Sequence, residues 1–175
     1  MRIISTRFAG VFIIEPEKHE DARGFFARTF CAREFRERGL AANFVQCSVS
    51  LSHKRGTMRG LHYQRRPACE VKLVRCTAGA LWDVIVDLRQ GSPTYLQHLG
   101  VELTGRNRRA LYVPEMFAHG SQSLEEETEI FYQISEYHSP EAAFGVRYND
   151  PKLGIQWPLP VVAVSDRDAN WPLLG

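Results

Sequence analysis

An all-β fold, built as an antiparallel sandwich or barrel, is predicted by two features of the sequence. Short runs rich in β-branched and aromatic residues recur along the chain, and turn residues such as glycine, asparagine and proline separate them. Few windows show the spacing of apolar positions that an amphipathic helix needs. Short strands at such intervals are typical of sheets that pack face to face or close into a barrel.

The middle of the chain supplies the expected strands. The run 80–88 is mostly apolar and ends at a Gly-Ser-Pro turn, and the run 128–135 alternates between apolar and polar residues. Alternation with a period of two places successive side chains on opposite faces of a strand. The expected strands are residues 71–76, 80–88, 96–103, 109–114 and 128–135.

One helix is expected, at residues 32–38. This segment contains no glycine or proline, offers Phe35 as its buried residue and stops before Gly39, a residue type that commonly follows a helix. The last third of the chain is expected to form irregular segments that lie against the sheets, because it carries Pro140, Pro151, Pro158, Pro160 and Pro172.

Length and charge exclude several classes of protein. At about 150 residues per domain, the 175 residues are expected to form a single domain, 1–175. The 22 Lys and Arg against 20 Asp and Glu leave a net charge of +2, without the basic excess typical of nucleic-acid binding. No run approaches the roughly 18 apolar residues of a membrane span, and no signal peptide is recognisable. We therefore expect a cytoplasmic protein with no membrane and no nucleic-acid partner.

The cysteines do not form a metal or redox motif. Cys31, Cys47, Cys69 and Cys76 include no C-x-x-C pair, and a chain of this length needs no disulfides to stabilise its core. Reduced and mostly buried thiols are expected.

Residues 55–64 are the densest stretch of polar and aromatic residues. His62 is a candidate general base, since the imidazole pKa lies nearest to neutrality; the alternative is a core histidine bonded to a backbone carbonyl. His62 and Gln64 share one face of a strand, as do Glu70 and Lys72 of the next. Polar groups at core-facing positions are costly unless they are used.

The same residues partly match the layout of a metal-binding cupin. Cupins bind a metal with two histidines and a glutamate from a strand pair and a third histidine after a turn, and His62, Glu70 and His119 follow that order. Gln64 stands where the second histidine belongs, which removes a strong ligand for a transition metal. We therefore expect no metal.

Three further residues could complete a metal-free site. Lys72 could stabilise a developing oxyanion, or it could be a surface residue between two inward-facing apolar neighbours. Tyr132 could donate a proton or could simply belong to the core. Asp168 could orient His62 by accepting its ring N–H, or it could be a solvated turn residue.

These motifs resemble those of the dTDP-4-dehydrorhamnose 3,5-epimerase family, sugar-nucleotide epimerases with a metal-free, cupin-like jelly roll. The resemblance runs in order from about residue 10 to the C-terminus, and the combination of RGLHYQ, KLVR and FAHG is highly specific. The matching segments are 21–26, 44–46, 56–64, 72–75, 83–89, 92–94, 113–120, Tyr132, 149–151, 155–158 and 165–168.

The resemblance implies a role for each matching residue. His62 would be the base, Asp168 its orienting carboxylate, Lys72 the cation at the C4 keto oxygen, and Tyr132 the acid on the opposite face. Binding of a dTDP-linked nucleotide sugar would fall to Arg23, Phe26, Gln46, Ser48, Arg59, His119 and His138.

The resemblance also implies the fold, the assembly and the reaction. The fold would be a cupin-like double-stranded β-helix, or jelly roll, with short flanking helices. The protein would be a homodimer whose N-terminal segments cross, so that Arg23 and Phe26 serve the neighbouring site. It would epimerise a 4-keto-6-deoxyhexose at C3 and C5 through an enolate and without a cofactor.

Several positions depart from the family pattern, and alternatives therefore stay open. Ser48 replaces a common asparagine, Arg28 a common acid, Ser121 a phenylalanine, Arg167 a lysine and His138 a tyrosine. These changes leave the proposed catalytic set intact but bear on which nucleotide or sugar fits. The alternatives are a 3- or 5-mono-epimerase, a metal-dependent cupin and a non-catalytic sugar-nucleotide binder.

Overall fold

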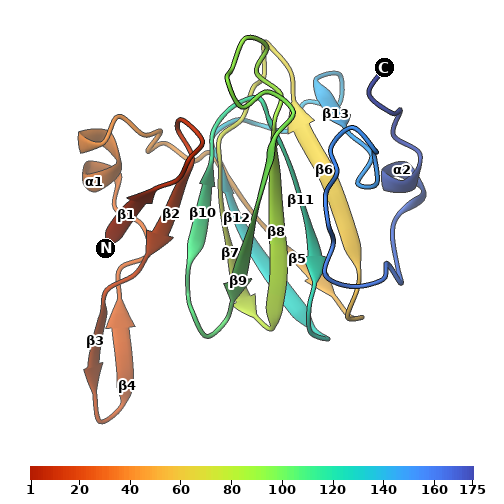
Figure 1. Ribbon diagram of the computed structural model, residues 1–175. Coiled ribbons are helices and arrows are strands. Elements are labelled where there is room, and N and C mark those ends of the chain that lie inside the picture. Colours follow the sequence, from red (N-terminus) through yellow and green to blue (C-terminus); the bar gives the residue numbers. More distant parts are fainter.

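The computed structural model describes residues 1–175 and contains two antiparallel sheets and a separate hairpin (Figure 1). The first sheet has six strands in the order β1 (Arg2–Ser5), β2 (Phe12–Glu15), β10 (Ala110–Val113), β7 (Lys72–Ala78), β12 (Thr128–Ile134) and β5 (Gln46–Ser52). The second has five, in the order β13 (Ala143–Gly145), β6 (Met58–Gln64), β11 (Phe117–Ser123), β8 (Ala80–Asp87) and β9 (His98–Thr104). β3 (Lys18–Asp21) and β4 (Gly24–Ala27) form the hairpin.

The main core lies between the two sheets. Val74 and Ile130 of the six-stranded sheet and Leu81 and Ile85 of the five-stranded sheet belong to one cluster of fully buried apolar side chains. β12 alternates because one of its faces is buried against the facing sheet, whereas β8 is buried on both faces along nearly its whole length. The predicted all-β class is confirmed.

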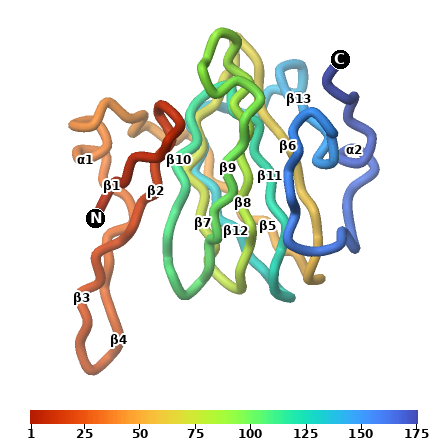
Figure 2. The backbone as a smooth tube through the Cα atoms, in the orientation of Figure 1, coloured from red at the N-terminus to blue at the C-terminus, as the bar shows by residue number.

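The outer face of each sheet is also partly covered. Phe35 of helix α1 (Ala32–Glu37) packs with Leu73 and Tyr112 on the outer face of the six-stranded sheet. The C-terminal third covers the other sheet, where Val146 and Leu153 join a cluster with its outward-facing residues. Figure 2 shows this segment, drawn in blue, running alongside β6. The expectation that the proline-rich third lies against the sheets is confirmed.

The helices are short and have recognisable ends. α1 ends one residue earlier than expected, and Gly39 just beyond it has a φ of +69°, in the left-handed region that glycine adopts readily. The second helix, α2 (Asp166–Ala169), begins after Ser165, whose hydroxyl accepts a hydrogen bond from the Asp168 N–H at 3.1 Å. Neither helix is long or apolar enough to cross a membrane.

All four cysteines are free, as predicted. The expectation that most of them are buried is wrong, because only Cys76 is buried and Cys47 is exposed. Cys47 lies on β5, an edge strand whose Ser48 and Ser50 face the other sheet, so its own side chain points to an outer face that nothing in the chain covers.

Candidate active site

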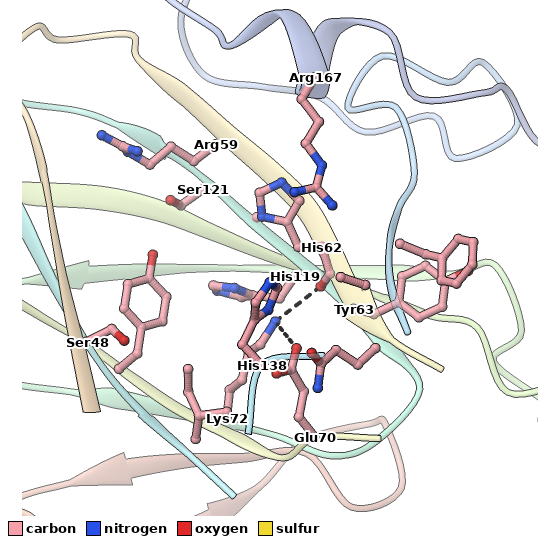
Figure 3. A pocket seen from close by; sticks show the side chains of 16 residues that line it. Ser48, Arg59, His62, Tyr63, Glu70, Lys72, His119, Ser121, His138 and Arg167 are labelled. Carbon is pink, nitrogen blue, oxygen red and sulfur yellow. Dashed lines mark hydrogen bonds and ion pairs between the residues drawn. The ribbon is translucent and has the colours of Figure 1, made fainter. Parts of the chain in front are cut away.

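A pocket of about 280 Å³ opens between the two sheets and is lined by residues from both (Figure 3). This volume is near the lower end for small-molecule sites, which run from about 300 to 1,000 Å³. A wider groove of about 520 Å³ adjoins it and shares Arg59, His62, Tyr132 and Arg167 with it. The pocket is lined by Ser48, Arg59, His62, Tyr63, Gln64, Glu70, Lys72, His119, Gly120, Ser121, Tyr132, Ile134, His138, Ala143, Phe144 and Arg167.

A β-bulge in β6 brings Arg59 and His62 to the same face. His62 pairs with His119 and Arg59 pairs with Ser121, so β6 carries one residue more than β11 between the two pairs. Without the bulge, residues three apart would point to opposite faces of the strand. Both side chains therefore line the pocket, as Figure 3 shows.

Asp168 anchors the His62 imidazole. Its Oδ1 lies 2.6 Å from His62 Nε2, and its Oδ2 accepts a hydrogen bond from the Gly60 N–H at 3.0 Å. Burial alone would raise the pKa of Asp168, but the bonds from His62 and Gly60 outweigh it and hold that pKa below its ordinary value. The carboxylate is buried and paired, so the reading of Asp168 as a solvated turn residue is wrong.

Tyr132 enters the pocket from the sheet opposite His62. Its hydroxyl is 3.4 Å from Ser50 Oγ, and its ring meets the His119 ring edge-on with centroids 6.1 Å apart. Burial raises the pKa of the phenol to about 12. Tyr132 therefore keeps its proton well above neutral pH.

Lys72 also comes from the six-stranded sheet and is nearly buried. Its Nζ donates to the backbone carbonyl oxygen of His62 at 3.3 Å and forms an ion pair with Glu70 Oε1 at 2.8 Å, the two contacts dashed in Figure 3. Val71 and Leu73 are buried too, but on the outer face beside Phe35. The alternative of a surface lysine is wrong, since both faces of this strand are covered.

A second histidine–aspartate pair lies deeper in the site. His119 Nε2 is 2.7 Å from Asp83 Oδ1, and both side chains are buried. Asp83 Oδ2 has no hydrogen-bond partner. Sequence reasoning did not single out Asp83 as a site residue, although a carboxylate inside the apolar run 80–88 was a signal that it has a partner.

The Gln64 side chain links β6 to two loops through hydrogen bonds to their backbone. Its amide nitrogen donates to the carbonyl oxygens of Ala68 at 2.8 Å and Tyr137 at 3.2 Å, and its oxygen accepts from the Ser139 N–H at 2.7 Å. No group of three or more histidine, cysteine, aspartate or glutamate side chains is arranged to hold a metal ion.

Four of the other predicted binding residues lie in the pocket or beside it. Ser48, Arg59 and His138 line the pocket, and Arg59 is held by Ser52 Oγ at 3.1 Å and by the Leu51 carbonyl at 2.7 Å. Gln46 lies outside the lining, where its side-chain oxygen accepts from the His138 N–H at 2.7 Å. It supports the loop that carries His138.

Arg23 and Phe26 lie away from this pocket, on the β3–β4 hairpin. The hairpin projects from the N-terminal side of the sandwich, whereas β6 and α2 lie on the other side (Figure 1). The Arg23 side chain is 90% exposed and pairs only with Asp21, and Phe26 is 75% exposed. Within one chain, these two residues cannot complete the site.

A sandwich with a polar pocket between its sheets is the architecture of a cupin-like enzyme. The family model for dTDP-4-dehydrorhamnose 3,5-epimerase matches residues 5–175. The dTDP-4-dehydrorhamnose 3,5-epimerase of Methanothermobacter thermautotrophicus is 44% identical over 173 residues, which cover 97% of this chain and 92% of the relative.

Two solved structures are similar along nearly their whole length. The dTDP-4-dehydrorhamnose 3,5-epimerase of Bacillus anthracis, with TDP and pyrophosphate bound, has a TM-score of 0.95, 41% identity and 99% coverage of both chains. The dTDP-6-deoxy-D-glucose-3,5-epimerase of Legionella pneumophila, in complex with dTDP-4-keto-L-rhamnose, has a TM-score of 0.91 and 42% identity, covering 98% of this chain and 92% of its own.

The chain belongs to the dTDP-4-dehydrorhamnose 3,5-epimerase family. The predicted family, the cupin-like jelly roll and the enzyme class, an isomerase, are confirmed.

Proposed function

We propose that this protein epimerises dTDP-4-dehydro-6-deoxy-D-glucose at C3 and C5 and yields dTDP-4-dehydro-L-rhamnose. The observation that carries the proposal is that a paired histidine and a protonated tyrosine enter one pocket from opposite sheets. The names of the relatives and the ligands of the two solved structures support this choice of substrate.

The reaction needs three groups around the sugar. The C4 ketone acidifies the C–H bonds at C3 and C5, and removal of either proton leaves an enolate. His62 takes the proton, and Asp168 fixes the imidazole and stabilises the imidazolium that forms. The Lys72 ammonium stabilises the charge that develops on the C4 oxygen.

Inversion follows from the placement of the acid. Tyr132 gives a proton to the face of the enolate opposite His62, which reverses the configuration of the carbon. Its raised pKa keeps the phenol protonated between turnovers. All electrons stay on the substrate, so the step needs no redox cofactor.

The remaining pocket residues bind the nucleotide sugar. His119 and His138 contact the hexose, while Arg59 holds the diphosphate by charge-assisted hydrogen bonds. Arg23 joins Arg59 at the diphosphate, and Ser48, Gln46 and Phe26 act on the nucleoside side. The adjoining groove gives the part of the substrate beyond the sugar a place to extend.

We propose in addition that the protein is a homodimer in which the β3–β4 hairpin of each chain reaches the other's site. Phe25 and Phe26 on the hairpin and Val49 and Leu51 on the edge strand β5 are exposed apolar residues, and an unpaired edge with apolar neighbours favours association. Light scattering tests this by distinguishing a dimer, about twice the mass of one chain, from a monomer of 20.0 kDa. The four free thiols fit the reducing conditions of the cytoplasm, where we place the enzyme.

Proton NMR in D₂O tests the proposed reaction. We expect the C3 and C5 protons of dTDP-4-dehydro-6-deoxy-D-glucose to exchange for deuterium while the L-rhamno product accumulates. Exchange and inversion at one carbon only would make the protein a mono-epimerase. Binding without exchange at either carbon would make it a non-catalytic binder.

A further inference from the structure

We infer that Glu70 is a positioning residue, which aims the Lys72 ammonium at the substrate's carbonyl oxygen through a direct ion pair. The inference rests on the proposed function and adds a residue to it. Glu70 Oε1 lies 2.8 Å from Lys72 Nζ, and the two side chains are only 11% and 10% exposed. Both line the pocket (Figure 3).

The geometry of an ammonium group makes the pair directional. Lys72 Nζ has three N–H bonds, arranged tetrahedrally, and a flexible stem of four carbons. One N–H is directed to Glu70 and a second to the backbone carbonyl oxygen of His62, 3.3 Å away. With two donors engaged, one N–H is left, and Lys72 is among the residues that line the pocket. The carbonyl contact also ties the position of Lys72 to the strand that carries the base.

The segment that carries Glu70 is held on both sides. The Ala68 carbonyl oxygen accepts from the Gln64 amide at 2.8 Å, and the Val71 N–H donates to Ser135 Oγ at 2.8 Å. The Val71 side chain is buried on the far face of the strand, which leaves Glu70 pointing into the pocket. A carboxylate on such a rigid segment can restrain a lysine that would otherwise sample many rotamers.

Stability alone does not account for the pair. Burying two charges carries a desolvation penalty that their attraction often fails to repay, so apolar residues commonly serve the core as well. A nearly buried pair with one free donor facing a cavity is better explained by its effect on a bound molecule. In the enolate step, an ammonium already aimed at the oxygen needs no reorganisation when charge develops.

The test is a double-mutant cycle between Glu70 and Lys72. Glu70→Leu keeps the approximate volume and removes the acceptor, and Glu70→Gln keeps an acceptor oxygen at the same reach. We expect Glu70→Leu to lower kcat about tenfold or more, since a hydrogen bond to a charged group is lost. KM should stay within about twofold, because the ion pair does not hold the nucleotide. Glu70→Gln should restore kcat to within about threefold of wild type, and the exposed control Glu126→Gln should have no effect.

The decisive arm repeats Glu70→Leu in a Lys72→Met background. If Glu70 acts through Lys72, the second substitution adds no further loss. The same fold-loss in both backgrounds, or wild-type kcat for Glu70→Leu, would overturn the inference. Glu70→Ala is measured in parallel, and binding of dTDP by each variant shows that it is folded. A wild-type protein that exchanges no sugar protons in this assay would refute the proposed function instead, so the two failures are distinguishable.

Discussion

His62 and Asp168 lie 106 residues apart in the sequence, yet their side chains meet at 2.6 Å. The contact joins β6, an interior strand of the five-stranded sheet, to helix α2 in the segment that covers the sheet. Because Asp168 also accepts the Gly60 N–H, the carboxylate fixes the strand backbone and the imidazole together. The packing of the C-terminal segment against β6 therefore brings the His62 imidazole and its carboxylate partner together.

The Asp168 carboxylate should stabilise the fold in a pH-dependent way. Its pKa is lowered in the folded state, so its contribution is present above the ordinary carboxyl pKa of about 3.9 and is lost as the pH falls through the folded value. Asp168→Asn should lower the free energy of unfolding by about 1–3 kcal/mol at pH 7. Urea unfolding from pH 7 to pH 3 should show this deficit shrinking as the pH falls. Asp166→Asn, at an exposed position of the same helix, is the control, and an equal Asp168→Asn deficit at both pH values would rule out the linkage.

Gly60 should tolerate no side chain. It has a φ of +113°, and a Cβ added there would lie 2.5 Å from the Gly120 Cα. Gly154 also has a positive φ, +57°, but has open space around the added atom. Gly60→Ala should therefore destabilise by about 2–4 kcal/mol, whereas Gly154→Ala should show only the backbone effect of about 1 kcal/mol. Thermal unfolding of the two variants measures the difference, and equal losses would contradict the close-packing argument.

Chelation should leave the activity unchanged. The Gln64 amide is hydrogen-bonded to three backbone groups, and Glu70 is paired with Lys72. Neither side chain is therefore free to bind a metal beside His62. Dialysis against EDTA followed by the exchange assay checks this. Activity lost to EDTA and recovered with one divalent metal would restore the metal-dependent alternative.

Mixed dimers test whether Arg23 serves the neighbouring site. If it does, a dimer of one Arg23→Ala chain and one His62→Ala chain has both lesions in one site and an intact second site. Such dimers should regain about half the wild-type rate, although each homodimer is impaired. If Arg23 served its own chain, every site would carry one lesion, and mixing the chains would restore nothing.

Much of the fold could be predicted from local sequence patterns, because burial of a strand face determines which positions are apolar. The runs 80–88 and 128–135 became β8 and β12 within about a residue, since one face of each packs in the core. The helix at Phe35 followed from its terminating Gly39. The strands β1 to β6, β11 and β13 received no bounds from the sequence. In β3 and β5, the exposed residues produce no clear alternation of burial.

Of the contacts within the candidate site, only that between His62 and Asp168 was predicted from the sequence. Placing His62, Lys72 and Tyr132 in one pocket needed the family resemblance, since each had a structural alternative of its own. The bulge that turns Arg59 to the same face as His62 arises from pairing with β11, and no local pattern reveals it. Asp83 was missed because its partner, His119, lies 36 residues away in the sequence, on the neighbouring strand β11.

The role of His62 as base and Tyr132 as acid is tested most directly by solvent exchange in two variants. His62→Ala should abolish both deuterium incorporation and turnover, because no enolate forms; loss of a general base commonly costs about 10²–10⁴-fold. Tyr132→Phe keeps the ring and the base, so His62 can remove a proton and return a deuteron to the original face.

The deciding measurement is therefore proton NMR of dTDP-4-dehydro-6-deoxy-D-glucose with Tyr132→Phe in D₂O. The account predicts deuterium at the carbon next to the ketone without accumulation of the inverted product. Inversion by Tyr132→Phe at the wild-type rate, or exchange by His62→Ala at the wild-type rate, would contradict it.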